Sequence, residues 1–262
     1  MTPDELRIAG FLDPRRALSF FEELPGGAEA WERDLGASAD PDQALLAAIR
    51  LHEADPGLVR GLVDKPDARR RVCAVLGGSQ WLGDYVIAYP ARAVSIWEDP
   101  GQSRQVLLAS VGATRAEGGA YVAAEGASAD DLRAAYRRVL LSVAADDLTS
   151  EDPEALMPEV GRRIADLVDA TLEAGLALAR RDIDPQGQTP FAIIAMGKTG
   201  ARELNYISDV DVVYVVGQAQ HSQTVGEPLS FRVLGAGHAG ATVDRGREPA
   251  PGGTQRGPRS HG

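Results

Sequence analysis

The sequence predicts an α+β protein in which a helical region precedes a strand–turn–strand unit. Up to about residue 181, apolar residues recur at helical spacing, and serine, aspartate or proline marks the start of each helix. Residues 191–196 and 210–216 are instead short continuous apolar runs rich in β-branched residues, as is typical of buried strands. Because helical patterns come first and strands follow abruptly, we expect a helical domain ahead of an α+β domain.

The helical region divides into two parts. Residues 1–40 predict an irregular N-terminal segment with short helical pieces and turns, and residues 41–185 predict a helical domain. Within that domain, helix starts are predicted at Asp40-Pro41, Asp55, Asp67 and Ser128, and the longest helix is predicted from Thr149 or Ser150 to about Arg181, with Pro158 as a kink or a later start. Residues 186–216 then begin the second domain.

Composition excludes several classes of function. The net charge of −11 argues against nucleic-acid binding as the main role. No apolar run is long enough to cross a bilayer, and the N-terminus lacks the pattern of a secretory signal, so a cytoplasmic location without membrane contact is expected. The single cysteine, Cys73, lies in a helical pattern and is expected to be a buried thiol.

Two aspartates mark the second strand. Asp209 and Asp211 are at positions i and i+2, so on a strand both carboxylates point to the same side, about 7 Å apart along the backbone. Like charges side by side repel, which makes them poor structural elements. Hard divalent cations prefer such oxygen ligands and bridge them to phosphate oxygens. Asp209 and Asp211 are therefore the candidate catalytic residues and metal ligands.

A glycine-containing turn precedes these aspartates. Gly197 and Gly200 provide backbone that can approach a phosphate closely, ahead of a short helical turn expected over ARELN. Ser208 adds a hydroxyl beside the aspartate pair, and Lys198 either contacts phosphate or is exposed to solvent. These four residues are the candidate nucleotide- or phosphate-binding residues. A P-loop is excluded, because that motif requires glycine where position 192 is alanine.

The spacing of this turn and the S-D-x-D that follows is similar to that of nucleotidyltransferases of the DNA polymerase β type. The stretch GKTGARELNYISDVDVVYVV closely resembles the signature of glutamine synthetase adenylyltransferase, a bifunctional enzyme that adds AMP to a tyrosine of glutamine synthetase and removes it. The earlier segment SQWLGDYVIAYP also resembles this family. The resemblance covers roughly residues 40–216 and is strongest from residue 191 onward. It implies the start of a nucleotidyltransferase fold.

The resemblance also implies the chemistry. The family transfers AMP from ATP to the tyrosine, or uses phosphate to remove it and release ADP. Mg²⁺ or Mn²⁺ is the implied cofactor, held here by Asp209 and Asp211. Glutamine synthetase is the implied partner, with a PII-type signalling protein as a possible second partner of the full-length enzyme, and nitrogen assimilation is the implied process.

The resemblance is expected to end near residue 216. Residues 217–262 are rich in glycine and proline and predict a disordered tail unrelated to the family. In the family, a later strand carries a third carboxylate; Asp244 is a conceivable remnant, but its surroundings do not form a strand pattern. A truncated or frame-shifted product is the simplest hypothesis, and weak or no activity is expected of it.

Two alternatives stay open. One is a non-catalytic helical fragment that acts through interactions. The other is a different nucleotidyltransferase, such as a uridylyltransferase that modifies a signalling protein or an aminoglycoside-modifying enzyme. Those enzymes also use S-D-x-D, but their glycine turn usually reads G-G-x-x-R-x-E-L. The direction of the reaction, addition or removal of AMP, is left open by the sequence.

Overall fold

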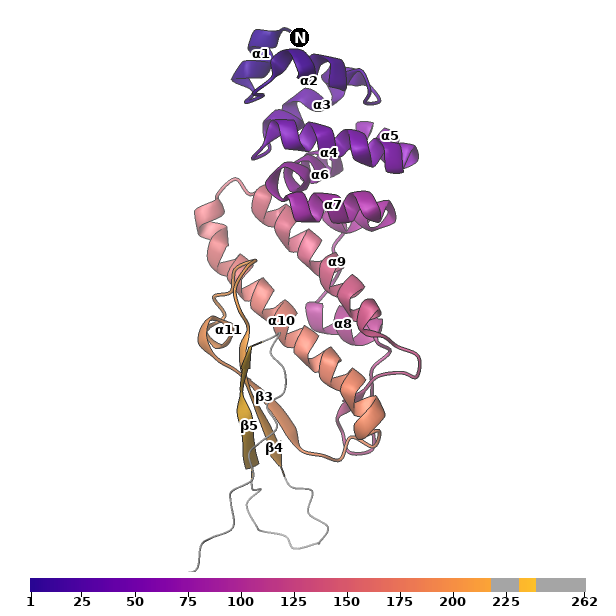
Figure 1. Cartoon of the computed structure of the whole chain (residues 1–262), viewed down its shortest axis with the longest axis vertical. Helices are drawn as coiled ribbons and strands as arrows, with labels where there is room; N and C mark the ends of the chain where they lie inside the picture. Colours follow the sequence, from indigo (N-terminus) through magenta and orange to yellow (C-terminus); the bar gives the residue numbers. More distant parts are fainter. Residues whose placement is uncertain (218–230, 239–262) are drawn as a thin grey trace, which may run out of the picture.

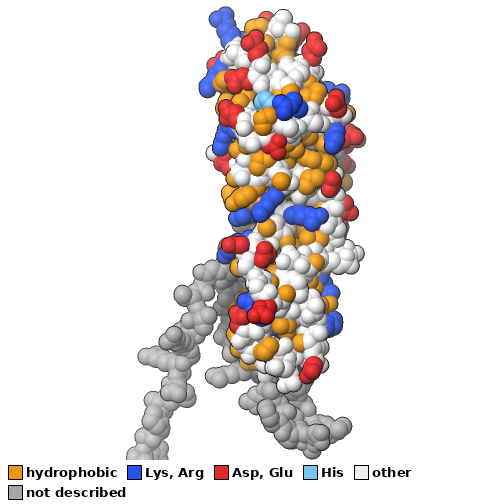
Figure 2. All heavy atoms as spheres, turned by 90° about the vertical axis from the view of Figure 1, so that its right-hand side faces the viewer, with side chains coloured by type: hydrophobic (Ala, Val, Ile, Leu, Met, Phe, Trp, Pro, Cys, Tyr) orange, Lys and Arg blue, Asp and Glu red, His pale blue; other side chains and the backbone are white. Residues whose placement is uncertain are grey.

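The computed structural model describes residues 1–217 and 231–238 of the chain. The described residues form an elongated molecule, with helices stacked along its long axis and a sheet beside the longest helix at the end opposite the N-terminus (Figure 1). Acidic and basic side chains are interspersed along the whole length of the face in Figure 2. Within the described residues, no helix combines the length and the apolar character that a membrane span requires.

The first 40 residues are more regular than predicted. They form three helices, α1 (Pro3–Ile8), α2 (Pro14–Phe21) and α3 (Gly27–Gly36). Side-chain oxygens of Thr2 and Asp13 accept hydrogen bonds from backbone N–H groups and so cap α1 and α2. The helices bury Leu6, Phe21 and Trp31 in the same core as the rest of the helical region. Each helix is only two or three turns long, so packing rather than local propensity stabilises it.

Two of the middle helices begin at the predicted aspartates, and α6 begins at Pro66, one residue before the predicted Asp67, without a side-chain cap. Asp40 and Asp55 accept hydrogen bonds from Gln43 and Leu58 and cap the helices that follow, each of which has proline in its first turn. This part of the chain consists of α4 (Pro41–Ala54), α5 (Pro56–Val63), α6 (Pro66–Gly78), α7 (Gln80–Ala88) and the 3₁₀ helix η1 (Pro90–Ile96). Cys73 on α6 is fully buried, as predicted, and burial raises the pKa of its thiol.

Two long helices lie between the shorter helices and the sheet. After α8 (Ser103–Ser110) and a short hairpin of β1 (Thr114–Arg115) and β2 (Tyr121–Val122), α9 (Ala129–Leu148) and α10 (Pro153–Ile183) run side by side (Figure 1). Ser128 caps α9 as predicted. The predicted start of α10 is wrong by a few residues: Asp152 caps it and Pro153 occupies its first turn, while Pro158 lies inside the helix.

The sheet follows α10. Strands β3 (Phe191–Ala195) and β4 (Asp211–Gly217) pair antiparallel, with Phe191 opposite Val216, as the two apolar runs predict. Helices followed by this strand–turn–strand unit confirm the predicted α+β class.

A third strand, β5 (Phe231–His238), pairs antiparallel with the other side of β4. For residues 231–238 the expectation of disorder is therefore wrong. The physical reason is that the free edge of β4 carries backbone N–H and C=O groups which a neighbouring segment can pair with, even one rich in glycine. The other tail residues, among them Asp244, lie outside the described residues.

Candidate functional site

The turn between β3 and β4 begins one residue after β3 ends. It is a single helical turn, α11 (Gly197–Ala201), so the helix covers GKTGA rather than the predicted ARELN. Arg202 ends it, because its backbone takes the left-handed conformation (φ +61°) and its N–H donates to the carbonyl of Thr199. At the start of the turn, the N–H of Met196 donates to the carbonyl of Asp211 at 2.9 Å, which ties the turn to the beginning of β4.

Both glycines of the turn are required by close approaches. Gly197 has a left-handed backbone (φ +52°), and a Cβ there would lie 3.2 Å from carboxylate oxygen Oδ2 of Asp211. A Cβ at Gly200 would lie only 2.7 Å from the carbonyl oxygen of Ala195. The predicted juxtaposition of glycine turn and aspartate is thus present: the carboxylate of Asp211 lies directly beside Gly197.

The other predicted residues lie at different places around this point. Asp211 is the first residue of β4, whereas Asp209 is exposed and lies two residues before the strand, so the prediction that both aspartates belong to the strand is wrong for Asp209. Lys198 is exposed on α11. The hydroxyl of Ser208 lies 2.9 Å from Oδ1 of Asn205 and accepts from the N–H of Asn205 at 3.2 Å, so it helps to close the turn before Asp209.

The chemistry of this arrangement fits a divalent cation bound together with phosphate. Gly197 carries no Cβ against the carboxylate of Asp211, and Asp209 presents a second hard oxygen donor to solvent. Among the described residues there is no group of three or more acidic, histidine or cysteine side chains placed to hold a metal. Mg²⁺ in phosphoryl-transfer sites is commonly held by one or two carboxylates, with water and substrate phosphate as its other ligands. A pair of aspartates is therefore sufficient for that kind of site.

Sequence reasoning assigned no role to three residues of the same motif that connect it to the helices. Leu204 is 3 % exposed and belongs to the core of the helical region. Arg202 forms ion pairs with Asp166 and Asp169 of α10. The hydroxyl of Tyr206 donates to Asp147 of α9 at 2.9 Å. The motif itself gave no signal for these contacts, because the partners of Arg202 and Tyr206 lie 33 to 59 residues earlier in the chain.

Thr199 is a further feature that sequence reasoning missed. Its side chain is 3 % exposed, and its hydroxyl is buried without a hydrogen-bond partner among the described residues. We expect Thr199→Val to raise the free energy of unfolding by about 1 kcal/mol, because it removes an unsatisfied polar group at nearly constant volume. Urea unfolding followed by circular dichroism measures the change.

Thr171→Val is the matched control. The Thr171 hydroxyl donates to the carbonyl of Leu167 at 2.7 Å, so the same substitution there removes a satisfied group and should give no gain. A loss of stability in Thr199→Val would show that the hydroxyl has a partner after all.

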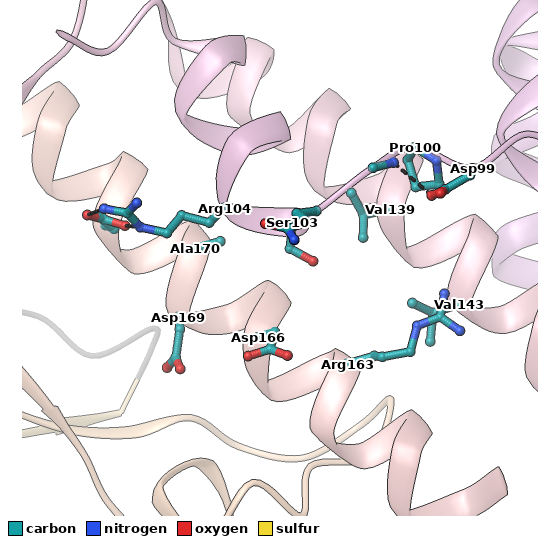
Figure 3. Close-up of a pocket in the computed structure, with 13 residues that line it drawn as sticks. Asp99, Pro100, Ser103, Arg104, Val139, Val143, Arg163, Asp166, Asp169 and Ala170 are labelled. Carbon is teal, nitrogen blue, oxygen red and sulfur yellow. Dashed lines mark hydrogen bonds and ion pairs between the residues drawn. The ribbon is translucent and has the colours of Figure 1, made fainter.

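A cavity of about 770 Å³, lined by neither Asp209 nor Asp211, lies between α8, α9 and α10 (Figure 3). Arg104 and Glu173 form an ion pair at one side of it, and Asp166 and Asp169 project from α10 toward the later part of the chain. Among the described residues that line this cavity, none belongs to the candidate metal or phosphate site. The cavity is therefore a feature of the helical frame, separate from that site.

Comparison with known proteins supports the family resemblance predicted from the glycine turn and the S-D-x-D motif. The family model described as glutamate-ammonia ligase adenylyltransferase matches residues 69–232, so the similarity continues beyond residue 216, where we expected it to end. Three similar relatives are each described as a bifunctional glutamine synthetase adenylyltransferase/adenylyl-removing enzyme. They come from Cutibacterium acnes (38 % identity, 74 % of this chain and 20 % of the relative), Bifidobacterium longum (37 %, 82 % and 22 %) and Streptomyces coelicolor (36 %, 85 % and 22 %).

The chain spans about a fifth of the length of these relatives, with 20 to 22 % of each covered. No solved structure matches it significantly. The match of the family model covers more than half of the chain and includes the glycine turn and both aspartates. The chain belongs to the glutamate-ammonia ligase adenylyltransferase family.

Proposed function

We propose that this chain supplies part of a metal-dependent adenylyl-transfer site that acts on a tyrosine of glutamine synthetase. The observation that carries the proposal is the carboxylate of Asp211 beside Gly197, at the point where a turn with required glycines meets a strand. The names of the relatives support the substrate, since each is described as acting on glutamine synthetase. They also favour adenylyl transfer over the uridylyltransferase and aminoglycoside alternatives.

The reaction is a displacement at phosphorus in either direction. When AMP is added, the tyrosine oxygen bonds to the α-phosphorus of ATP, and the bond to pyrophosphate breaks. When AMP is removed, an oxygen of inorganic phosphate bonds to that phosphorus, the bond to the tyrosine oxygen breaks, and ADP leaves. Both reactions place negative charge on the oxygens around phosphorus, so positive charge and hydrogen-bond donors must lie close to them.

The residues of this site meet these requirements in different ways. Asp209 and Asp211 would hold Mg²⁺ or Mn²⁺, and a bound cation neutralises charge on the phosphate oxygens and orients them. Gly197 would let a phosphate approach the backbone beside Asp211 without meeting a Cβ. The missing Cβ of Gly200 lets the turn pack against the carbonyl of Ala195 and so holds this backbone in place. Lys198, exposed on α11, adds a positive charge at the same turn.

The proposal extends to the setting of the reaction. ATP, ADP and inorganic phosphate are the small-molecule substrates and products, and glutamine synthetase is the protein partner. We include in the proposal a PII-type signalling protein as a second partner and the cytoplasm as the location, which the family resemblance implies.

Binding of ADP tests the proposal. We expect the chain to bind ADP more tightly with Mg²⁺ than without it, as measured by calorimetry. Lys198→Ala should weaken binding about fivefold, which corresponds to about 1 kcal/mol, because one exposed charge on the phosphates is lost.

Lys65→Ala is the matched control, since Lys65 is the only other lysine of the chain and lies outside the site. Equal binding by both lysine variants would remove Lys198 from the phosphate site. ADP binding that is indifferent to Mg²⁺ would contradict the proposed function itself.

A further inference from the structure

The segment 202–208, here called the anchor segment, connects α11 to Asp209 and packs on the helices rather than on the sheet. Its Leu204 is buried in the core of the helical region. The buried valines of the neighbouring strand, Val212 and Val215, lie outside that core cluster. The anchor segment is therefore a direct physical link between the helices and the residues that carry the candidate site.

Arg202 holds one end of this segment at a conformational cost. Among the described residues it is the only non-glycine residue with a positive φ, a conformation that a long side chain adopts only when its surroundings impose it. The compensation is visible in its contacts, because the guanidinium pairs with Asp166 and lies 3.6 Å from Oδ2 of Asp169. Figure 3 shows both carboxylates projecting from α10 on the side where the later chain passes.

The helix surface is shaped to receive the anchor segment. A Cβ at Gly161 of α10 would lie 3.3 Å from the carbonyl oxygen of Leu204 and 3.6 Å from that of Arg202. Glycine in the interior of a helix is unfavourable by itself. At Gly161 it lets the backbone of the anchor segment come close to α10.

The other end of the segment is held by α9. The hydroxyl of Tyr206 donates to Asp147, and burial together with this hydrogen bond raises the pKa of the Tyr206 phenol. Asn205 and Ser208, on either side of Tyr206 and Ile207, close a turn through their side chains, and Asp209 follows at once. Asp209, the candidate metal ligand, therefore lies only three positions after Tyr206, the last residue held by the helices.

We propose that Arg202, Leu204 and Tyr206 are positioning residues that use α9 and α10 to set the place of Asp209 beside Asp211. This inference rests on the proposed metal site and adds what controls its geometry. Because Asp209 lies outside β4, the sheet by itself does not place its carboxylate. The helices place the Asp209 carboxylate through the anchor segment, so contacts with α9 and α10 determine the geometry of the site.

Arg202→Gly tests the proposal by the sign of its effect on Mn²⁺ binding. Glycine accepts the positive φ, so the urea midpoint should change little. Loss of a nearby cation would by Coulomb attraction alone make Mn²⁺ bind more tightly. Loss of positioning should instead weaken Mn²⁺ binding about 10-fold, the low end for groups that orient metal ligands.

A second pair of variants keeps the test independent of Arg202. Gly161→Ala places a methyl group against the anchor segment and should weaken Mn²⁺ binding. Gly175→Ala makes the same change in the same helix, where among the described residues nothing beyond the neighbouring backbone of α10 lies within 4 Å of the new Cβ, and it should leave binding unchanged. If Arg202→Gly lowers the urea midpoint strongly, this pair decides the question.

The outcomes separate the two proposals. If Asp211→Asn leaves Mn²⁺ binding unchanged, the metal site itself is wrong. If Asp211→Asn weakens binding, but Arg202→Gly binds as tightly as the unaltered chain and the two glycine variants bind alike, the site stands and the positioning role is overturned. Weaker binding in Arg202→Gly and Gly161→Ala, with Gly175→Ala unchanged, supports the positioning role.

Discussion

Replacing Asp211 or Asp209 with asparagine should weaken Mn²⁺ or Mg²⁺ binding by at least about 10- to 100-fold, the range seen when only an outer partner of a metal ligand is lost. Each substitution keeps the size of the side chain and removes one of two negative charges, so the remaining site is a single carboxylate. Asp211 lies beside Gly197 and should show the larger loss. Titration calorimetry, or the relaxation of water protons by bound Mn²⁺, measures the affinity.

Asp130→Asn provides the control for this experiment. It makes the same change of charge on an exposed carboxylate that pairs with Arg133 at the start of α9. Its Mn²⁺ affinity should equal that of the unaltered chain. Equal affinity in all three variants would show that Asp209 and Asp211 are not metal ligands.

Gly200→Ala should lower the free energy of unfolding by about 1–3 kcal/mol, the usual cost of forcing an extra carbon into a packed site. The new Cβ would lie 2.7 Å from the carbonyl oxygen and 3.2 Å from the carbonyl carbon of Ala195. Both are backbone atoms of β3, so no side-chain rotation relieves the overlap. Either α11 or the end of β3 must shift, and Mn²⁺ binding should weaken in the same variant.

Gly175→Ala is the control with the opposite sign. Gly175 lies inside α10, and apart from nearby backbone of that helix its Cβ would meet no atom of the described residues within 4 Å, so the exchange should stabilise the chain by about 0.5–1 kcal/mol through helix propensity. Urea midpoints of the two variants give the comparison. A midpoint for Gly200→Ala at or above that of the unaltered chain would show that the turn has room for a side chain.

Local signals predicted most of the helical frame and the strand pair. Asp40, Asp55 and Ser128 cap helices where the sequence places them, since a cap depends only on a side chain and the three residues that follow it. The pairing of β3 with β4 followed from two apolar runs separated by one turn. The start of α10 was predicted too early because Thr149 and Ser150 are also good capping residues. The observed cap is Asp152, which is followed by Pro153, a residue favoured in the first turn of a helix.

Long-range contacts decided what local signals missed. Helices α1, α2 and α3 are too short to be stable alone, and burial of residues such as Leu6, Phe21 and Trp31 stabilises them. β5 has a weak strand pattern and forms against the free edge of β4. Helix α11 ends at Arg202 because that residue adopts a left-handed backbone, with two carboxylates of α10 bound to its side chain.

The sequence alone determined the family, the glycine turn and the two aspartates, because a motif of some 20 residues carries its chemistry in residue types and spacing. Tertiary structure alone showed that Asp211 lies against Gly197, that Asp209 precedes the strand, and that the anchor segment ties the site to α9 and α10. The partners of Arg202 and Tyr206 are 33 to 59 residues away in the chain. Spacing within a motif carries no information about such contacts, which exist only once the helices have packed.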